Sequence, residues 1–162
     1  MSDAPAPRDA AEQARLDAAI ADLFERRIVF NGFLGFRLEP RGAGGEARIG
    51  FRMRDELVGH FLHGRLHGGA ISSVLDAVGG LAVVWAIADR HAHEGVGGIM
   101  ERFRHLGTVD LRVDYLRQGV GTRFVASGET VRLGRRLAAT AMRLANGDGT
   151  LIATGNATYV VS

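Results

Sequence analysis

The chain has 162 residues, of which 46% are hydrophobic and 23% charged, so we expect a single globular domain with a proper core. It has no cysteine, which excludes disulfides and cysteine catalysis. The formal net charge is +2, and all 20 basic residues are arginines scattered along the chain, so the composition does not indicate a nucleic-acid partner.

The N-terminal part is expected to be a loose tail followed by a helix. Residues 1–7 lack the apolar core of a signal peptide, so we expect a cytoplasmic protein. From Arg8 to about Arg27, apolar side chains recur at helical spacing, which predicts an amphipathic helix that packs on the main domain. Acidic residues on its polar face disfavour a membrane surface. We therefore divide the chain into residues 1–30, the tail and helix, and residues 31–162, the main domain.

A β-hairpin is expected next, after the apolar, glycine-containing residues 30–36. Its predicted strands are Phe36–Glu39 and Glu46–Met53, because the residues between them are rich in glycine and contain a proline. In the second strand apolar residues alternate with arginines, so one face should be buried. Residues 54–66 are predicted to be a loop that leads to the main helix.

One long apolar stretch predicts a buried helix that begins at Gly68 and ends beyond Trp85. A helix that is apolar nearly all round belongs inside a core. Its longest apolar run, residues 78–88, is expected to be too short and too rich in glycine to span a membrane.

Asp76 is the acidic residue inside this apolar helix. Helical spacing places it on one face with Ser72, Gly79 and Val83. Burying a carboxylate is costly unless it is hydrogen-bonded. Asp76 is therefore either a structural residue capped by Ser72 or Ser73, or a functional one.

The helix is expected to start with two glycine amides, those of Gly68 and Gly69. Amides in the first helical turn have no intrahelical partner, so they suit a developing oxyanion. The alternative is that the glycines only allow close packing of the helix start. Gly68 and Asp76 are eight residues apart, about 12 Å along a helix. One carbonyl group cannot contact both, so a joint role requires two antiparallel copies of this helix in a two-fold dimer.

The C-terminal part of the sequence predicts β-structure. Residues 89–104 are polar and undefined, and four strands follow at 108–116, 122–133, 136–144 and 150–161, separated by glycine-containing turns. Three consecutive hairpins predict an antiparallel meander. The expected fold is α+β, with a curved antiparallel sheet wrapped around a long central helix.

Two motifs point to a known family. His67-Gly68-Gly69, with Asp76 nine residues after the histidine, resembles the PaaI-type (phenylacetate-pathway) acyl-CoA thioesterases of the hotdog superfamily. Residues 107–117 resemble the strand that follows the helix in that family. The resemblance extends from about Phe33 to the C-terminus. It implies a hotdog fold, hydrolysis of an acyl-CoA, a homodimer or dimer of dimers, and no cofactor, because coenzyme A is part of the substrate.

The resemblance also implies roles for single residues. Asp76 would be the general base or nucleophile, and the Gly68 amide would polarise the thioester carbonyl, with Gly69 beside it. Thr108 would position the attacking water, unless it is an ordinary strand threonine. His67 is either a helix cap bonded to the backbone or a residue that orients the carbonyl group, and the resemblance favours the second. Asp110 and Asp114 are expected on the strand face that carries Thr108.

Further candidates concern substrate binding. Either His60 or His63 is expected to replace an asparagine, sometimes a glutamine, that many relatives carry in the loop before the helix. A metal site formed with His67 is disfavoured, because Gly59 and Gly64 make this stretch a loop and no carboxylate accompanies the histidines. Gly79, Gly80 and the apolar residues around Trp85 are expected to shape an acyl pocket. Three arginines around a predicted turn are either a solvated hairpin tip or a clamp for the phosphates of coenzyme A: Arg132, Arg135 and Arg136.

Two other functions fit the same fold. Gly59-His60-Phe61 faintly resembles the histidine loop of the acyl-carrier-protein dehydratases, which keeps a hotdog dehydratase or hydratase open. The other alternative is a non-catalytic acyl-CoA-binding module. The helix carboxylate disfavours it, because binding a neutral thioester gains nothing from a buried negative charge.

Overall fold

A computed structural model describes residues 6–162; the start of the expected tail, residues 1–5, lies outside the described residues. The helical segments are α1 (Ala10–Asp22), the π-helix η1 (Leu23–Arg27), α2 (Val29–Leu34), the short 3₁₀ turn η2 (Asp55–Leu57), α3 (Gly68–Arg90) and α4 (Val96–Phe103). The strands are β1 (Arg37–Glu39), β2 (Ala47–Arg52), β3 (Val58–His60), β4 (Arg65–Leu66), β5 (Gly107–Tyr115), β6 (Arg123–Leu133), β7 (Leu137–Asn146) and β8 (Leu151–Val160).

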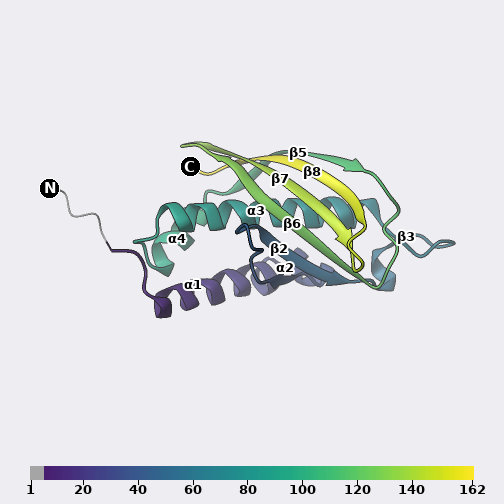
Figure 1. Ribbon diagram of the computed structural model, residues 1–162, viewed down its shortest axis with the longest axis horizontal. Helices are drawn as coiled ribbons and strands as arrows, with labels where there is room; N and C mark the ends of the chain where they lie inside the picture. Colours follow the sequence, from purple (N-terminus) through teal and green to yellow (C-terminus); the bar gives the residue numbers. More distant parts are fainter. Residues whose placement is uncertain (1–5) are drawn as a thin grey trace.

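The central helix α3 lies against the concave face of the sheet (Figure 1). It begins at Gly68 as predicted, and it continues to Arg90, beyond the predicted minimum. It has 23 residues, and an 18-residue stretch within it has a mean hydropathy of 1.9, so by length and composition it could span a membrane and the expectation of too short an apolar stretch is wrong. Most of that stretch, 72%, is buried inside the protein, as in the core helix of a globular domain.

The main sheet is antiparallel with strand order β1-β2-β6-β7-β8-β5. The predicted alternation of β2 is confirmed, because Ala47, Ile49 and Phe51 are buried against the core. Gly128 of β6 allows the helix to approach closely, since a Cβ atom there would lie 2.9 Å from the carbonyl oxygen of Val78. A curved antiparallel sheet around a long helix is the α+β hotdog arrangement, so the expected fold is confirmed.

The predicted meander is wrong for its first strand. β6, β7 and β8 are consecutive neighbours, but β5 pairs with β8 and lies at the far edge of the sheet. The residues after β5 do not turn back as a hairpin, because Leu116 and Arg117 donate backbone hydrogen bonds to Ile152 and Gly119 accepts one from Leu66. These contacts direct the chain across the end of the domain to β6.

Regions expected to be irregular contain short elements. The N-terminal helix packs on the body as predicted, with Leu16 and Ile20 fully buried. Residues 29–34 form α2, which Gly35 ends with a left-handed φ of 73°. The expected loop before α3 contains the β3–β4 hairpin, and the undefined segment after α3 contains α4.

Candidate active site

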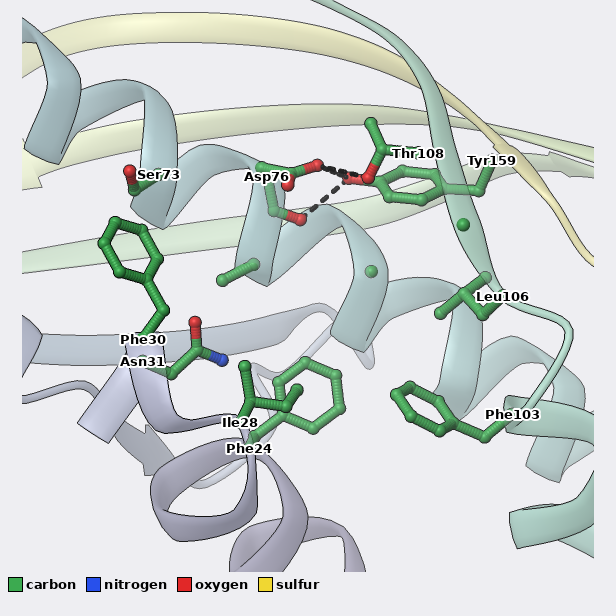
Figure 2. A pocket seen from close by; sticks show the side chains of 13 residues that line it. Phe24, Ile28, Phe30, Asn31, Ser73, Asp76, Phe103, Leu106, Thr108 and Tyr159 are labelled. Carbon is green, nitrogen blue, oxygen red and sulfur yellow. Dashed lines mark hydrogen bonds between the residues drawn. The ribbon is translucent and has the colours of Figure 1, made fainter. Parts of the chain in front are cut away.

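Asp76 lies half-buried on α3, with its carboxylate held by two side chains from the sheet (Figure 2). The Thr108 hydroxyl donates to Oδ1 at 2.9 Å. The Tyr159 hydroxyl lies 3.2 Å from the same Oδ1 and donates to the Asp76 main-chain oxygen at 2.8 Å. Neither serine contacts the carboxylate, because Ser72 and Ser73 both donate to the carbonyl oxygen of Gly69. The structural alternative for Asp76, a hydrogen bond from Ser72 or Ser73 to its carboxylate, is therefore absent within residues 6–162.

Thr108 and Tyr159 reach Asp76 together because they are cross-strand partners in the β5–β8 pair. The register shifts just after Thr108, which pairs with Tyr159 while Asp110 pairs with Thr158. Val109 is therefore the extra residue of a β-bulge. The bulge reverses the alternation, so Asp110 and Asp114 lie on the opposite face from Thr108, contrary to the sequence prediction.

A cavity of about 250 Å³ opens beside the carboxylate. Its walls are mainly apolar and come from the N-terminal segment, α3, α4 and the start of β5 (Figure 2). The rings of Phe24 and Phe103 meet edge to face there, with centroids 6.0 Å apart. The lining residues are Phe24, Ile28, Phe30, Asn31, Ser73, Asp76, Ala77, Gly80, Phe103, Leu106, Gly107, Thr108 and Tyr159.

Asn31 is a polar residue in the wall of this cavity that lies opposite α3. Its side chain points into the cavity from α2 (Figure 2), and only 6% of the residue is exposed. Within the described part of the chain its side-chain amide has no hydrogen-bond partner, so it remains available to a bound polar group. Asn31 was not predicted as a site residue, because the sequence pattern around it does not indicate that it lies beside α3.

The second part of the predicted site is the start of α3. His67 is the helix N-cap, and its Nδ1 accepts a hydrogen bond from the Gly69 amide at 2.8 Å. The capping role of His67 is thereby confirmed, and the Gly69 amide is occupied. The Gly68 amide has no protein acceptor in the described residues, while its carbonyl oxygen accepts from Tyr115 at 3.2 Å. Gly68 borders a hollow separate from the cavity at Asp76.

We expect His67→Ala to lower the free energy of unfolding by about 1 kcal/mol, because the helix loses its side-chain cap. Urea denaturation measures this change. His67→Asn, which retains a capping acceptor, should restore most of the loss. Equal stability of His67→Ala and the wild type would contradict the capping role.

His60 and His63 lie on the hairpin beside the helix start. Their rings stack with centroids 4.8 Å apart, and His60 Nδ1 is buried with no partner in the described residues. Gly59 brings this hairpin close to His67, since a Cβ atom at Gly59 would lie 2.7 Å from the His67 Cα. The two histidines therefore lie on the Gly68 side of the molecule.

The three arginines of the predicted clamp lie at the opposite end of α3. Arg132, Arg135 and Arg136 are exposed around the β6–β7 turn. That turn is attached to the helix C-terminus, because Arg90 donates to the carbonyl oxygens of Leu133 and Gly134. Gly68 and Arg90 are about 33 Å apart along the helix. Within one chain the arginines are therefore remote from Gly68.

Of the two glycines expected to shape the acyl pocket, one lies at the cavity beside Asp76. Gly80 lines the cavity, whereas Gly79 faces the sheet. Trp85 is also elsewhere: it is buried beneath the guanidinium of Arg41, 5.2 Å from the ring centroid. Ser73, not Ser72, lines the cavity. The sequence pattern therefore identified the helix that lines the cavity, but three of the residues it singled out, Ser72, Gly79 and Trp85, do not line it.

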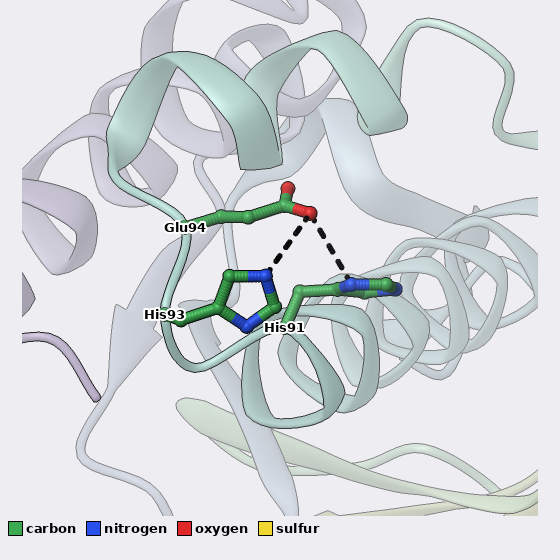
Figure 3. A group of neighbouring side chains, drawn as sticks. All are labelled: His91, His93 and Glu94. Carbon is green, nitrogen blue, oxygen red and sulfur yellow. Dashed lines mark ion pairs between the residues drawn. The ribbon is translucent and has the colours of Figure 1, made fainter. Parts of the chain in front are cut away.

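A group of ligand-type side chains, His91, His93 and Glu94, follows α3 (Figure 3). Its carboxylate is already paired, because Arg102 bonds both oxygens of Glu94 at 2.6 and 2.9 Å. The Arg102 hydrogen bond lowers the pKa of Glu94, while burial and then the Arg102 charge lower the pKa of His91. A metal ion here would lie beside a guanidinium, so we interpret the group as an ion-pair network that joins α3 to α4.

Comparison with known proteins gives a consistent result. The sequence profile of the thioesterase superfamily matches residues 63–153. The chain is 38% identical over 142 residues to the medium/long-chain acyl-CoA thioesterase YigI of Salmonella typhimurium, covering 88% of this chain and 91% of that protein. The protein of the same name from Escherichia coli strain K12 is 37% identical with the same coverage.

Solved structures agree. A Shewanella oneidensis protein related to the thioesterase superfamily superposes with a TM-score of 0.86 and 33% identity, covering 96% of this chain and 100% of that one. A putative thioesterase from Syntrophus aciditrophicus gives a TM-score of 0.80 and 30% identity, covering 94% and 100%.

Proposed function

Because this chain belongs to the thioesterase superfamily, we propose that it is an acyl-CoA thioesterase whose carboxylate catalyst is Asp76. The observation that carries the proposal is the Asp76 carboxylate, ordered by Thr108 at the edge of an apolar cavity. The apolar walls suit an acyl chain, and the carboxylate suits a water molecule.

In the proposed reaction Asp76 takes a proton from water while the water oxygen attacks the thioester carbon. The negative charge that develops on the carbonyl oxygen is stabilised by the Gly68 amide of a second subunit. Collapse of this intermediate breaks the carbon–sulfur bond, and the proton held by Asp76 neutralises the departing thiolate. A thiol is a much stronger acid than water, so the thiolate leaves without a dedicated acid.

A homodimer is part of the proposal. Gly68 and Asp76 lie in separate hollows of one chain, about 12 Å apart along α3, so one thioester reaches both only if two subunits contribute. β5 offers a surface for the second copy, because it is a nine-residue edge strand with β8 as its neighbour on one side. Val109 and Tyr115 on this strand are 60% and 56% exposed.

The size of the cavity supports a medium-length acyl group. A cavity of 150 Å³ accepts benzene, so about 250 Å³ accommodates roughly ten carbon atoms on the same scale. The relatives in Salmonella typhimurium and Escherichia coli are named medium/long-chain acyl-CoA thioesterases. We propose the same substrate class here.

The activity is tested with saturated acyl-CoAs of increasing length, by following the free thiol that hydrolysis releases. We expect turnover to be highest for medium chains. Hydration of an enoyl-CoA, followed by its ultraviolet absorbance, tests the dehydratase alternative, and we expect none. Binding of acyl-CoA without thiol release would contradict the proposal.

Phe103 is expected to limit the length of the acyl chain, because its ring meets Phe24 at the wall of the cavity. We expect Phe103→Ala to raise kcat/KM for chains that extend past this point, by up to about fourfold per additional buried methylene. Butyryl-CoA serves as the internal control, since it is too short to reach the ring. An unchanged ratio between long and short chains would show that the acyl chain binds elsewhere.

A further inference from the structure

Tyr159 is a buried tyrosine whose hydroxyl contacts the proposed base. It is 2% exposed on β8, and its hydroxyl bridges the main-chain oxygen of Asp76 at 2.8 Å and Oδ1 at 3.2 Å (Figure 2). It therefore holds both the helix backbone and the side chain at this position. Thr108 holds the same Oδ1 from the neighbouring strand.

Gly79 leaves the space that this hydroxyl occupies. A Cβ atom at Gly79 would overlap the Tyr159 hydroxyl oxygen, well inside the normal separation of non-bonded atoms. The same Cβ would lie 3.2 Å from both Met142 Sδ and Thr140 Oγ1, side-chain atoms that can move slightly. Glycine in a helix interior lowers the stability of the helix, so a glycine inside α3 is explained by the close packing that it allows. The hydroxyl of Tyr159 is the tightest contact it relieves.

The phenol stays a hydrogen-bond donor at every pH relevant to catalysis. Burial, together with the charge of Asp76, raises the pKa of Tyr159 far above its usual value. Asp76 and Tyr159 are the titratable residues among those that line the cavity in the described part of the chain. A protonated phenol donates a stronger hydrogen bond to a carboxylate than to a neutral acceptor, so Tyr159 can hold the Asp76 carboxylate in place.

We propose that Tyr159 is a positioning residue that orients the Asp76 carboxylate, and that position 79 is glycine to admit its hydroxyl. This inference rests on the proposed role of Asp76. It deepens that role, because it assigns a second-strand partner that neither the motif nor the family resemblance identified.

The first test is Tyr159→Phe, which removes the hydroxyl and keeps the ring. We expect kcat per folded enzyme to fall roughly 10- to 100-fold with little change in KM, because a hydrogen bond to a charged group is lost while the ring that lines the cavity is kept. A purely structural role would lower Tm and the folded fraction, and would leave kcat per folded enzyme unchanged.

The second test uses Gly79→Ala alone and together with Tyr159→Phe. Alone, the new methyl group displaces the hydroxyl, so we expect a fall in kcat per folded enzyme like that of Tyr159→Phe. In the double variant the clashing oxygen is gone, and adding Gly79→Ala should then change kcat by less than about twofold. If Tyr159→Phe does not fold, Gly79→Ala alone still tests the inference, because it retains the tyrosine.

Gly155→Ala is the matched control for crowding between α3 and the sheet. Its Cβ would lie 3.3 Å from Met142 Cε and 3.4 Å from Leu75 Cδ1, away from the Tyr159 hydroxyl. We expect it to lower Tm and leave kcat per folded enzyme unchanged.

The outcomes separate this inference from the proposed function. If Asp76→Asn is inactive while Tyr159→Phe retains the wild-type kcat per folded enzyme, the inference is wrong and the proposed function stands. Additive effects of Gly79→Ala and Tyr159→Phe on kcat would also overturn it. If Asp76→Asn is fully active, the role of Asp76 and the inference both fail.

Discussion

Replacing Asp76 with asparagine is expected to reduce kcat for acyl-CoA hydrolysis by roughly 10²- to 10⁴-fold. Asparagine has nearly the same shape and still accepts the hydrogen bond that Thr108 now donates to Oδ1. It cannot take a proton from water or attack a thioester, so the chemical step is lost while the cavity is preserved. Release of free thiol from a medium-chain acyl-CoA measures the effect.

Asp89→Asn is the matched control, because Asp89 is the other acidic residue of α3. It lies at the surface and pairs with Arg41 at 2.8 Å. Breaking an exposed ion pair costs about 0–1 kcal/mol of stability and does not touch the cavity. We therefore expect wild-type turnover from Asp89→Asn. Equal turnover of Asp76→Asn and the wild type would refute the catalytic role of Asp76.

Removing the amide hydrogen of Gly68 is expected to reduce kcat roughly 10²- to 10³-fold, the usual effect of losing one oxyanion donor. Gly68→Pro does this with little disturbance, because proline is accepted at the first position of a helix. The preceding His67 has φ −65° and ψ 138°, the extended conformation that a following proline favours. Steady-state kinetics on the same acyl-CoA measures the loss.

Gly68→Ala is the control for this substitution, because it retains the amide. Its Cβ would lie 3.5 Å from Tyr115 Cε1, an ordinary contact. We expect activity close to that of the wild type. Similar losses in the alanine and proline variants would show that space near Tyr115, and not the amide, is what matters.

The two inactive variants together test whether two subunits build one site. A mixed dimer of Asp76→Asn and Gly68→Pro subunits has one site with both defects and one intact site. Random reassembly of equal amounts should recover about a quarter of the wild-type activity, because half of the dimers are mixed and each has one working site of two. No recovery would place both groups in one chain and contradict the shared site.

Features that depend on near neighbours in the chain were predictable. The start of α3 follows from His67 and the two glycines, since a cap involves residues two positions apart. The burial of α3 and of one face of β2 follows from apolar periodicity. Asp76 was identified because a carboxylate in an apolar helix is costly to bury unless it is hydrogen-bonded or functional.

Features that depend on pairing between distant segments were not predictable. The position of β5 beside β8 was missed because alternation and turn residues do not specify which strand is the neighbour. The bulge after Thr108 reversed the predicted face of Asp110, since inserting one residue inverts every later side chain of a strand.

The sequence by itself determined the fold class, the central helix, its amide-rich start and its single internal carboxylate, because local periodicity and capping specify these. Only the tertiary structure decided which groups surround that carboxylate. Tyr159 and Asn31 come from positions 83 residues after and 45 residues before Asp76 in the chain, and of the two expected glycines Gly80 is the one that lines the cavity. Such neighbours are set by how the sheet and the N-terminal segment pack on α3, which no local pattern encodes.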